Sequence, residues 1–240
     1  MCTLEKRGSL FILTLTTDDD DQHRLNPTLI SSLLTAITQI KSQATDGSAL
    51  VTAAHGRFFC NGFDFDYARA AGSVTGSRTR LRHMSDSLRP VIAALFSLPM
   101  PTVAAVSGHA AAAGLILALA HDYVVMRSDR GVLYLPEMDL GITLPDYFAA
   151  VARAKIAPVQ ARRDLVLRGV KVRAVEALEM GIVHSAHDSA ESTVEAAMRL
   201  GEELAGRKWV GEAYGEIRKS LYPEVCSVLG LTLKPVISKI

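Results

Sequence analysis

The sequence PTVAAVSGHAAAAG, which spans Pro101 to Gly114, decides the fold. Its first six residues, 101–106, are small or β-branched and mostly apolar, so they predict a short buried strand. Ser107-Gly108 predicts a turn, and the alanines after it predict a helix whose first backbone N–H groups have no partner within the helix. A buried strand that leads through a turn into a helix is typical of α/β proteins with parallel sheets. We therefore expect an α/β fold.

A similar alternation of strand and helix is found upstream. Residues 10–16 and 49–54 predict two further strands. Between them, Asn26-Pro27 predicts a helix start, because Asn is a good N-cap and Pro suits the first helical position. That helix is expected to stop near Asp46-Gly47. The acidic run Asp18 to Asp21 cannot be buried and predicts a solvated loop.

Downstream, residues 123–126 predict another strand, and helices are expected from about Asp146 onward. Residues 173–180 predict a helix that ends at Gly181, a typical residue for a helix C-cap. Ile182-Val183 follows as a short apolar element.

The last fifty or so residues predict helices only. From Ser189 onward one helical face is marked by Val194, Met198, Gly201 and Leu204, with no strand pattern between them. We therefore divide the chain into a core, residues 1–188, and a C-terminal helical region, residues 189–240.

Composition excludes several classes of protein. The 240 residues are 49% hydrophobic and 21% charged, which is the usage of a globular chain and not of a disordered one. Lys and Arg total 26 against 25 Asp and Glu, so the net charge of +1 gives no global field that would attract nucleic acid or an anionic membrane. The longest wholly apolar run, residues 110–120, is far shorter than the roughly 18 residues that span a bilayer, so it predicts a buried core helix.

The N-terminal residues and the cysteines favour a reducing compartment. Charges at residues 5–7 stand where a signal peptide would have its apolar segment. Cys2, Cys60 and Cys226 lie too far apart in sequence for a metal-ligand or disulfide pattern.

Two loops are candidates for chemistry. Residues 56–64 and residues 107–114 each follow a predicted buried strand and carry small residues where backbone amides can face a ligand. Two such amides together can hold an oxyanion. Taken alone, such a pattern is more often that of a structural turn.

A family resemblance adds to this interpretation. Residues 57–64 resemble the first motif of the crotonase (enoyl-CoA hydratase/isomerase) superfamily, and residues 101–114 resemble its second. Leu25-Asn26-Pro27 is similar to the early helix start of the family, residues 173–183 to its helix-to-strand turn, and residues 136–141 to its active-site segment. The matches occur in the family's order and cover most of the chain.

The resemblance implies a crotonase (ClpP-like) spiral of ββα units, with a C-terminal helical region that builds a trimer or a dimer of trimers. It also implies a site for a fatty enoyl-CoA thioester, with no metal and no cofactor other than the coenzyme A of the substrate. The oxyanion donors carry over to the N–H groups of Phe63 and Ala113. Hydratases of that family usually have a glycine triplet where this chain has Ala112-Ala113-Gly114, which leaves the second donor ambiguous by one residue.

The carboxylates indicate the reaction. Hydratases of the family use two glutamates, and this chain matches the first with Ile116 and the second with Glu137. A single base in a dry acyl tunnel is similar to the enoyl-CoA isomerases, and residues 140–148 most resemble the plant peroxisomal type. The implied chemistry moves a proton from C2 of a cis- or trans-3-enoyl-CoA to C4, which gives the trans-2-enoyl-CoA of β-oxidation. Asp146 is a rival base that can equally cap the following helix.

Other residues are assigned to substrate binding or packing. The residues expected to contact the thioester substrate are Arg24, Cys60, Asn61, Gly62, Phe63, Asp64 and Ile116. Arg24, Arg57, Lys234 and Lys239 are candidates for the phosphates of coenzyme A. Within these sets, Cys60 is expected to act as a small filler and Asp64 to hold its loop. Phe63, Phe65, Tyr67 and Met84 line either the acyl tunnel or the core. His109 either packs within its loop or touches the thioester.

The tripeptide Ser238-Lys239-Ile240 resembles the peroxisomal address Ser-Lys-Leu, which implies a peroxisomal import receptor as a partner. Three alternatives to the isomerase stay open at this point. They are an enoyl-CoA hydratase, an acyl-CoA thioesterase of the same fold, and a noncatalytic acyl-CoA-binding subunit.

Overall fold

The computed structural model describes residues 1–16 and 21–236. Most of the acidic run, for which we predict a solvated loop, lies outside the described residues. The Ser238-Lys239-Ile240 tripeptide, for which we predict a targeting signal, lies outside them too. The main sheet has the strand order β1-β2-β3-β5-β7-β9. β1 pairs antiparallel with β2, and every other neighbouring pair in this sheet is parallel. The bounds of its strands are β1 Cys2–Arg7, β2 Leu10–Leu15, β3 Ala49–Ala54, β5 Thr102–Val106, β7 Tyr123–Arg127 and β9 Ser185–His187.

The first crossover confirms the predicted helix start. Helix α1 spans Pro27–Gln43, and the Asn26 side chain accepts a hydrogen bond from the Leu29 N–H at 2.9 Å. Helix α1 connects the parallel strands β2 and β3. Its apolar residues pack into the core, so the helix buries the face that the apolar spacing predicts. The helix ends three residues before the predicted turn at Asp46.

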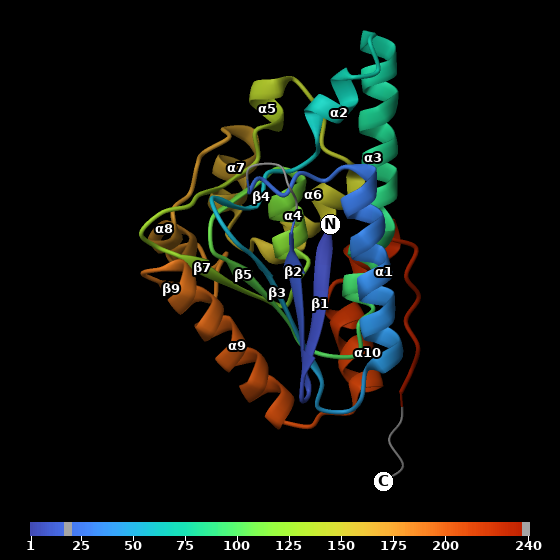
Figure 1. Cartoon of the computed structure of the whole chain (residues 1–240), viewed down its shortest axis with the longest axis vertical. Coiled ribbons are helices and arrows are strands. Elements are labelled where there is room, and N and C mark those ends of the chain that lie inside the picture. The colour runs from blue at the N-terminus through green and yellow to red at the C-terminus, as the bar shows by residue number, and fades with distance from the viewer. Residues whose placement is uncertain (17–20, 237–240) are drawn as a thin grey trace.

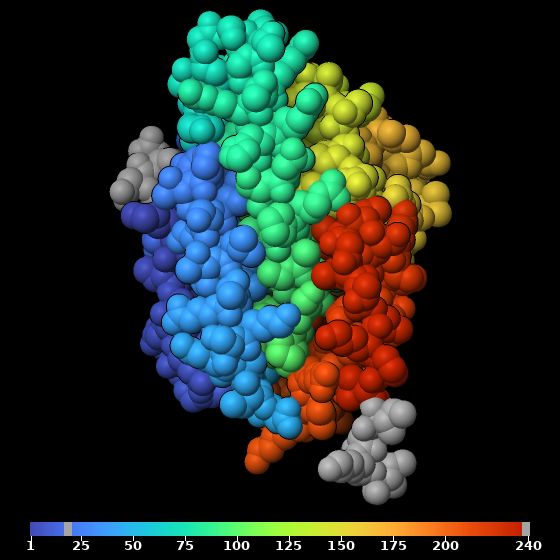
Figure 2. Space-filling model, turned by 90° about the vertical axis from the view of Figure 1, so that its right-hand side faces the viewer, coloured from blue at the N-terminus to red at the C-terminus, as the bar shows by residue number. Residues whose placement is uncertain are grey.

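Helices cover both faces of the main sheet (Figure 1). Helix α9 packs against one face, across β3, β5 and β7, while α1, α3 and α4 lie over the other. Figure 2 shows the outer side of this second layer, where α1, α3 and the C-terminal helices lie side by side. The bounds are α2 Phe65–Arg69, α3 Val74–Phe96, α4 Ala113–Leu119, α5 Glu137–Leu140, α6 Asp146–Lys155, α7 Val159–Leu167, α8 Ala174–Glu179, α9 Ala190–Gly206, α10 Gly211–Leu221 and α11 Pro223–Val228.

A second, small sheet positions the candidate site. Its strands β4 (Phe58–Cys60), β6 (His109–Ala111) and β8 (Leu133–Tyr134) lie in the order β4-β6-β8, and both pairs are parallel. Because parallel strands end at the same edge of a sheet, the residues that follow the three strands are brought together.

The structure differs from the sequence predictions at two places. β1 was not predicted; only Cys2 and Leu4 of its residues are half-buried, so it lacks an apolar run, and Gly8 at φ +59° forms the turn to β2. The short apolar element Ile182-Val183 closes α8, because both of its N–H groups donate to the Ala177 carbonyl, and β9 begins two residues later. Residues 65–87, where no structure was predicted, form α2 and most of α3.

The C-terminal helices pack on the core. Helix α9 begins at the boundary we placed after residue 188, with Ser189 as its N-cap, and it shares an apolar cluster with the main sheet. Arg218 of α10 is buried and donates to both carboxyl oxygens of Asp122 at 2.6 Å. In the part of the chain that is described, we find no helix with the length and apolar character needed to cross a bilayer.

Candidate active site

Three strand ends bring the predicted catalytic residues to one edge of the small sheet. Phe63 lies three residues beyond β4, Ala113 two residues beyond β6, and Glu137 three residues beyond β8. The Ala112 N–H donates to the Tyr134 carbonyl at 3.0 Å, which ties the second loop to the strand that precedes Glu137. Segments far apart in the sequence therefore meet at this edge.

Leu25 holds the first loop by its backbone on both sides of Phe63. The Leu25 N–H donates to the Gly62 carbonyl at 2.8 Å, and the Leu25 carbonyl accepts from the Asp64 N–H at 3.2 Å. Since successive peptide groups of an extended segment point to opposite sides, the Phe63 N–H points away from Leu25. No described backbone carbonyl accepts a hydrogen bond from it.

The two loops contact each other at glycines. Gly62 has φ +78°, and a Cβ placed there would lie 3.1 Å from the Ala111 carbonyl oxygen and 3.5 Å from the Ala113 nitrogen. A Cβ on Gly114 would lie 2.2 Å from the Cys60 carbonyl oxygen. These approaches require residues without a side chain, which explains the glycines in both motifs.

Ala112 adopts a backbone conformation that L-residues rarely occupy, with φ +48° and ψ −125°. The resemblance to the hydratases implies a glycine triplet over Ala112-Ala113-Gly114, so the chain keeps a glycine-like backbone at Ala112 at the expense of local strain. Ala113 is the first residue of α4, so its N–H has no acceptor within the helix. Among the described residues it donates to no other backbone carbonyl.

Glu137 is a buried carboxyl group at the start of α5. Its residue is 9% exposed, and its Oε2 atom is buried with no hydrogen-bond partner among the described residues. Burial raises the pKa of this carboxyl above its ordinary value, because the charged form is poorly solvated. A buried carboxyl group with one oxygen that has no described partner and with a raised pKa has the character of a general base.

Apolar side chains surround this edge. Ile116, the residue at the position of the first hydratase glutamate, is fully buried in α4. The Phe63 ring stacks on Phe148 of α6, with centroids 6.1 Å apart. Met84 is fully buried in the core cluster, whereas Tyr67 is 36% exposed. Of the two predictions for Met84, acyl tunnel or core, the structure therefore supports the core.

Several predicted substrate-binding side chains are engaged within the protein. The Cys60 thiol donates to the His23 carbonyl at 3.1 Å, and Cys60 is fully buried, as expected of a small filler. The Asn61 amide donates to the Gln22 side chain at 2.8 Å, and Asp64 caps α2 by accepting the Tyr67 N–H at 2.9 Å. The first loop is thus held by its own side chains.

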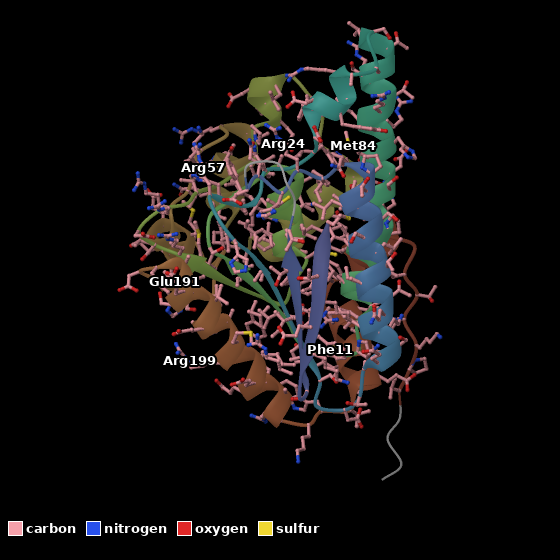
Figure 3. The ribbon with its side chains drawn as sticks, viewed as in Figure 1. Phe11, Arg24, Arg57, Met84, Glu191 and Arg199 are labelled. Carbon is pink, nitrogen blue, oxygen red and sulfur yellow. The ribbon has the colours of Figure 1, made fainter. Side chains whose placement is uncertain are left out.

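Arg24 and Arg57, two of the proposed phosphate contacts, lie at the end of the molecule that carries α2 and α5 (Figure 3). Arg24 forms an ion pair with Asp66 at 2.9 Å. The Arg57 guanidinium lies 5.5 Å from the centre of the Phe58 ring. The backbone N–H of Lys234, a third candidate, donates to Glu216 at 2.7 Å. Lys239 lies outside the described residues.

Asp146, the rival base, lies in an ion pair. Its Oδ1 is 2.5 Å from an Arg89 nitrogen, and its side chain is 56% exposed. Hydrogen bonding to Arg89 lowers the pKa of this carboxyl, which makes it a weaker base. The prediction that Asp146 caps the helix is wrong, because Pro145 is the N-cap residue of α6 and Asp146 lies in its first turn.

His109 is the first residue of β6, and its side chain packs on the neighbouring strand β4. Its ring lies against Phe58, with centroids 4.9 Å apart, and its Nδ1 is buried with no partner among residues 1–16 and 21–236. Burial lowers the pKa of His109, and three nearby cations lower it further, so the imidazole is neutral at pH 7. These cations are Arg57, Lys171 and Arg130.

Two features of the site were missed from the sequence. The clamp by Leu25 joins residues far apart in the chain, and no local pattern reveals such a contact. Phe148 carried a usable indication, because it lies in the segment 140–148 that resembles the isomerases. In the described ranges, no three His, Cys, Asp or Glu side chains form a cluster that could hold a metal ion.

The spiral of two sheets with a helical C-terminal region defines the crotonase fold, and the comparisons agree. Solved structures of the same fold include an enoyl-CoA isomerase from Mycobacterium tuberculosis (TM-score 0.82, 21% identity, 95% of this chain and 94% of that chain). Another is an enoyl-CoA hydratase from Bacillus halodurans (TM-score 0.80, 20% identity, 95% of this chain and 89% of that chain). At these identities the likeness establishes the fold alone.

Sequence comparison establishes the family. The model of the enoyl-CoA hydratase/isomerase family matches residues 7–220, and the chain belongs to this family. It is 60% identical to the peroxisomal enoyl-CoA delta isomerase 2 of Arabidopsis thaliana, over 96% of both chains. It is 56% identical to enoyl-CoA delta isomerase 3 of the same plant, over 97% of this chain and 96% of the relative.

Proposed function

We propose that this chain is a Δ3,Δ2-enoyl-CoA isomerase, which converts 3-enoyl-CoA to trans-2-enoyl-CoA. The observation that carries the proposal is the buried Glu137 carboxyl, whose Oε2 has no partner among the described residues. It lies at the sheet edge where the N–H groups of Phe63 and Ala113 donate to no described backbone carbonyl. The relatives named as enoyl-CoA delta isomerases, at 60% and 56% identity, support the same reaction.

In the proposed mechanism Glu137 is the only base. Its carboxylate removes a proton from C2 of the substrate, and the negative charge is delocalised onto the thioester oxygen. The Phe63 and Ala113 N–H groups stabilise that oxygen as charge develops; loss of one such donor costs about 3 to 4 kcal/mol in comparable sites. Protonated Glu137 then returns the proton at C4, which moves the double bond into conjugation with the carbonyl.

The absence of a second acid at position 116 separates this reaction from hydration. Addition of water needs one group to orient the water and another to deliver a proton. Ile116 is fully buried and aliphatic, so it does neither. We propose that it helps to keep the acyl site dry, which protects the dienolate from side reactions.

Substrate binding is proposed to use backbone groups of residues 60–64 and charged groups at the mouth. The phosphates of coenzyme A are expected to pair with Arg24 or Arg57, both at the same end of the molecule. The reaction needs no cofactor beyond the coenzyme A of the substrate, because proton transfer and charge stabilisation come from the chain itself.

We further propose a peroxisomal location and a trimer or dimer of trimers. Two relatives with the word peroxisomal in their names, at 60% and 50% identity, support the location. An N-terminally tagged chain should enter peroxisomes, and deletion of Ser238-Lys239-Ile240 tests whether the import receptor reads this tripeptide. Light scattering of the purified protein tests the oligomeric state.

An isotope experiment tests the single-base mechanism. With a 3-enoyl-CoA that carries deuterium at C2, Glu137 should return part of the label to C4 of the product. A hydratase would give a product heavier by one water, and a thioesterase would release free coenzyme A. Isomerised product with no label at C4, in conditions where the protonated base exchanges slowly, would argue for two separate groups.

A further inference from the structure

A polar cavity lies apart from the candidate active site. Its volume is about 390 Å³, and it lies between the C-terminal end of α6, the start of β7 and the turn after α8. The polar side chains that line it are His121, Asp122, Tyr123, Lys155, His184 and Tyr222. None of these belongs to the site described above, so the cavity invites a separate explanation.

Lys155 enters this cavity from the last turn of α6 without a carboxylate of its own. Its Nζ donates to the His121 carbonyl at 3.0 Å and lies 4.2 Å from the centre of the Tyr222 ring. An ammonium group has three N–H donors, and among the described residues only the His121 carbonyl accepts one. The residue as a whole is half-buried, and it forms part of the cavity wall.

The carboxylate nearest to Lys155 is committed elsewhere. Asp122 is held by Arg218 through two hydrogen bonds of 2.6 Å. The same carboxylate also accepts from the Thr102 N–H at 2.9 Å and from the Tyr214 hydroxyl at 3.3 Å. Two cations, Arg218 and Lys155, therefore lie near one buried carboxylate. Asp122 forms hydrogen bonds with Arg218 and none with Lys155.

These surroundings raise the neutral fraction of the Lys155 amine above that of an ordinary lysine. The pKa of Lys155 is lowered to about 8, chiefly by burial; the Asp122 charge raises it and the Arg218 charge lowers it by smaller amounts. His121, the other titratable group on this wall, has a pKa lowered to about 4 by burial and is neutral. At about pH 7.5 an amine with a pKa of about 8 is about one-quarter unprotonated, against about 0.1% for one at the ordinary lysine value.

We propose that Lys155 is an acylation site, at which the side-chain amine is modified by acyl-CoA thioesters. The Nζ lone pair attacks the thioester carbonyl carbon, the C–S bond breaks, and an amide bond forms. Coenzyme A leaves as the thiolate and takes up the proton that the nitrogen loses, so the step needs no other reactant. The cavity of about 390 Å³ has room for a short acyl group.

The experiment uses the native protein with acetyl-CoA and quantifies each acetylated peptide by mass spectrometry. The exposed Lys41 and Lys208 serve as internal references. We expect Lys155 to react about tenfold faster than these references at about pH 7.5, because the larger unprotonated fraction outweighs the lower nucleophilicity of a less basic amine. The advantage should shrink as the pH is raised towards about 10, where ordinary lysines also lose their protons.

Two controls separate the cavity from the local sequence. Guanidinium-denatured protein should show no preference for Lys155, and Lys155→Arg should remove only the signal of that peptide. Equal or slower reaction of Lys155 in the native protein, or a preference that survives denaturation, would overturn the proposal. Since acetyl-CoA is not a 3-enoyl substrate, this result is independent of whether the isomerase assignment holds.

Discussion

Gly114 packs directly on the backbone of Cys60, so close that a Cβ on Gly114 would lie 2.2 Å from the Cys60 carbonyl oxygen. This contact joins the start of α4 to the end of β4. It therefore sets how the two candidate oxyanion donors, at Phe63 and Ala113, lie relative to each other. The geometry of the site depends on a backbone approach that tolerates no side chain.

Gly114→Ala should disrupt the site through this contact. The added methyl group meets backbone and not a flexible side chain, so either the strand end or the helix start must shift. We expect kcat to fall at least tenfold and the free energy of unfolding to fall by about 1 to 3 kcal/mol. Gly206→Ala is the matched control, because no atom lies within 4 Å of its added Cβ. Equal effects of the two substitutions would contradict the packing argument.

Activity should fall on the acid side through the titration of Glu137. The mechanism needs the carboxylate, and burial raises its pKa, so protonation inactivates the enzyme at a higher pH than for an ordinary glutamate. The acid limb of kcat/KM should therefore lie above about 4.3. A pH profile measured between about 4 and 9 checks this, with Asp146→Asn expected to leave the limb in place. If Asp146→Asn moved the acid limb, the limb would belong to Asp146, and its assignment to Glu137 would be wrong.

Glu137→Gln should stabilise the protein at neutral pH. Both folded and unfolded chains hold Glu137 protonated below its unfolded pKa, so its charge has no effect there. As the pH rises through the raised folded pKa, ionisation of the buried carboxyl lowers the stability of the native protein. We expect the variant to be more stable than the parent chain at about pH 7.5 and to lose this advantage near about pH 4. Denaturant titrations at both values measure the difference, and a variant that is less stable at neutral pH would contradict the account.

Ile116→Glu should test the role of a dry wall. A carboxyl at this fully buried position is poorly solvated, so we expect the free energy of unfolding to fall by about 2 kcal/mol or more. In the folded fraction, a second acid should allow some hydration of trans-2-enoyl-CoA, seen by mass spectrometry as a product heavier by one water. Ile116→Gln has similar size without the acid and should give none. A folded Ile116→Glu protein that forms no hydrated product would show that Ile116 does not decide the reaction.

Local patterns predicted much of the main sheet. The strands at 10–15 and 49–54 and the helix that begins after Asn26 follow from apolar spacing and capping, which act within a few residues. Helix α3 was missed although Met84, Leu88, Val91 and Leu95 recur at helical spacing, because Pro90 lies inside it and its solvent face is polar. The exposed β1 carried no such spacing at all.

The candidate site was predictable in its parts and not in its assembly. Glycines and small residues marked the two loops, and the family resemblance singled out Glu137. The clamp of Leu25 on the first loop and the ion pair that Arg89 forms with Asp146 both join residues distant in sequence. Such contacts depend on the packed fold, so no window of sequence contains them.

The most direct test of the account is an assay of the purified protein with cis-3-hexenoyl-CoA, which follows the absorbance of the conjugated 2-enoyl product. Glu137→Gln and Asp146→Asn are assayed in parallel, with folding checked by circular dichroism. The account predicts rapid conversion by the parent chain and by Asp146→Asn, and loss of conversion in a folded Glu137→Gln. Full activity of Glu137→Gln, or loss of activity only in Asp146→Asn, would contradict the assignment of Glu137 as the base.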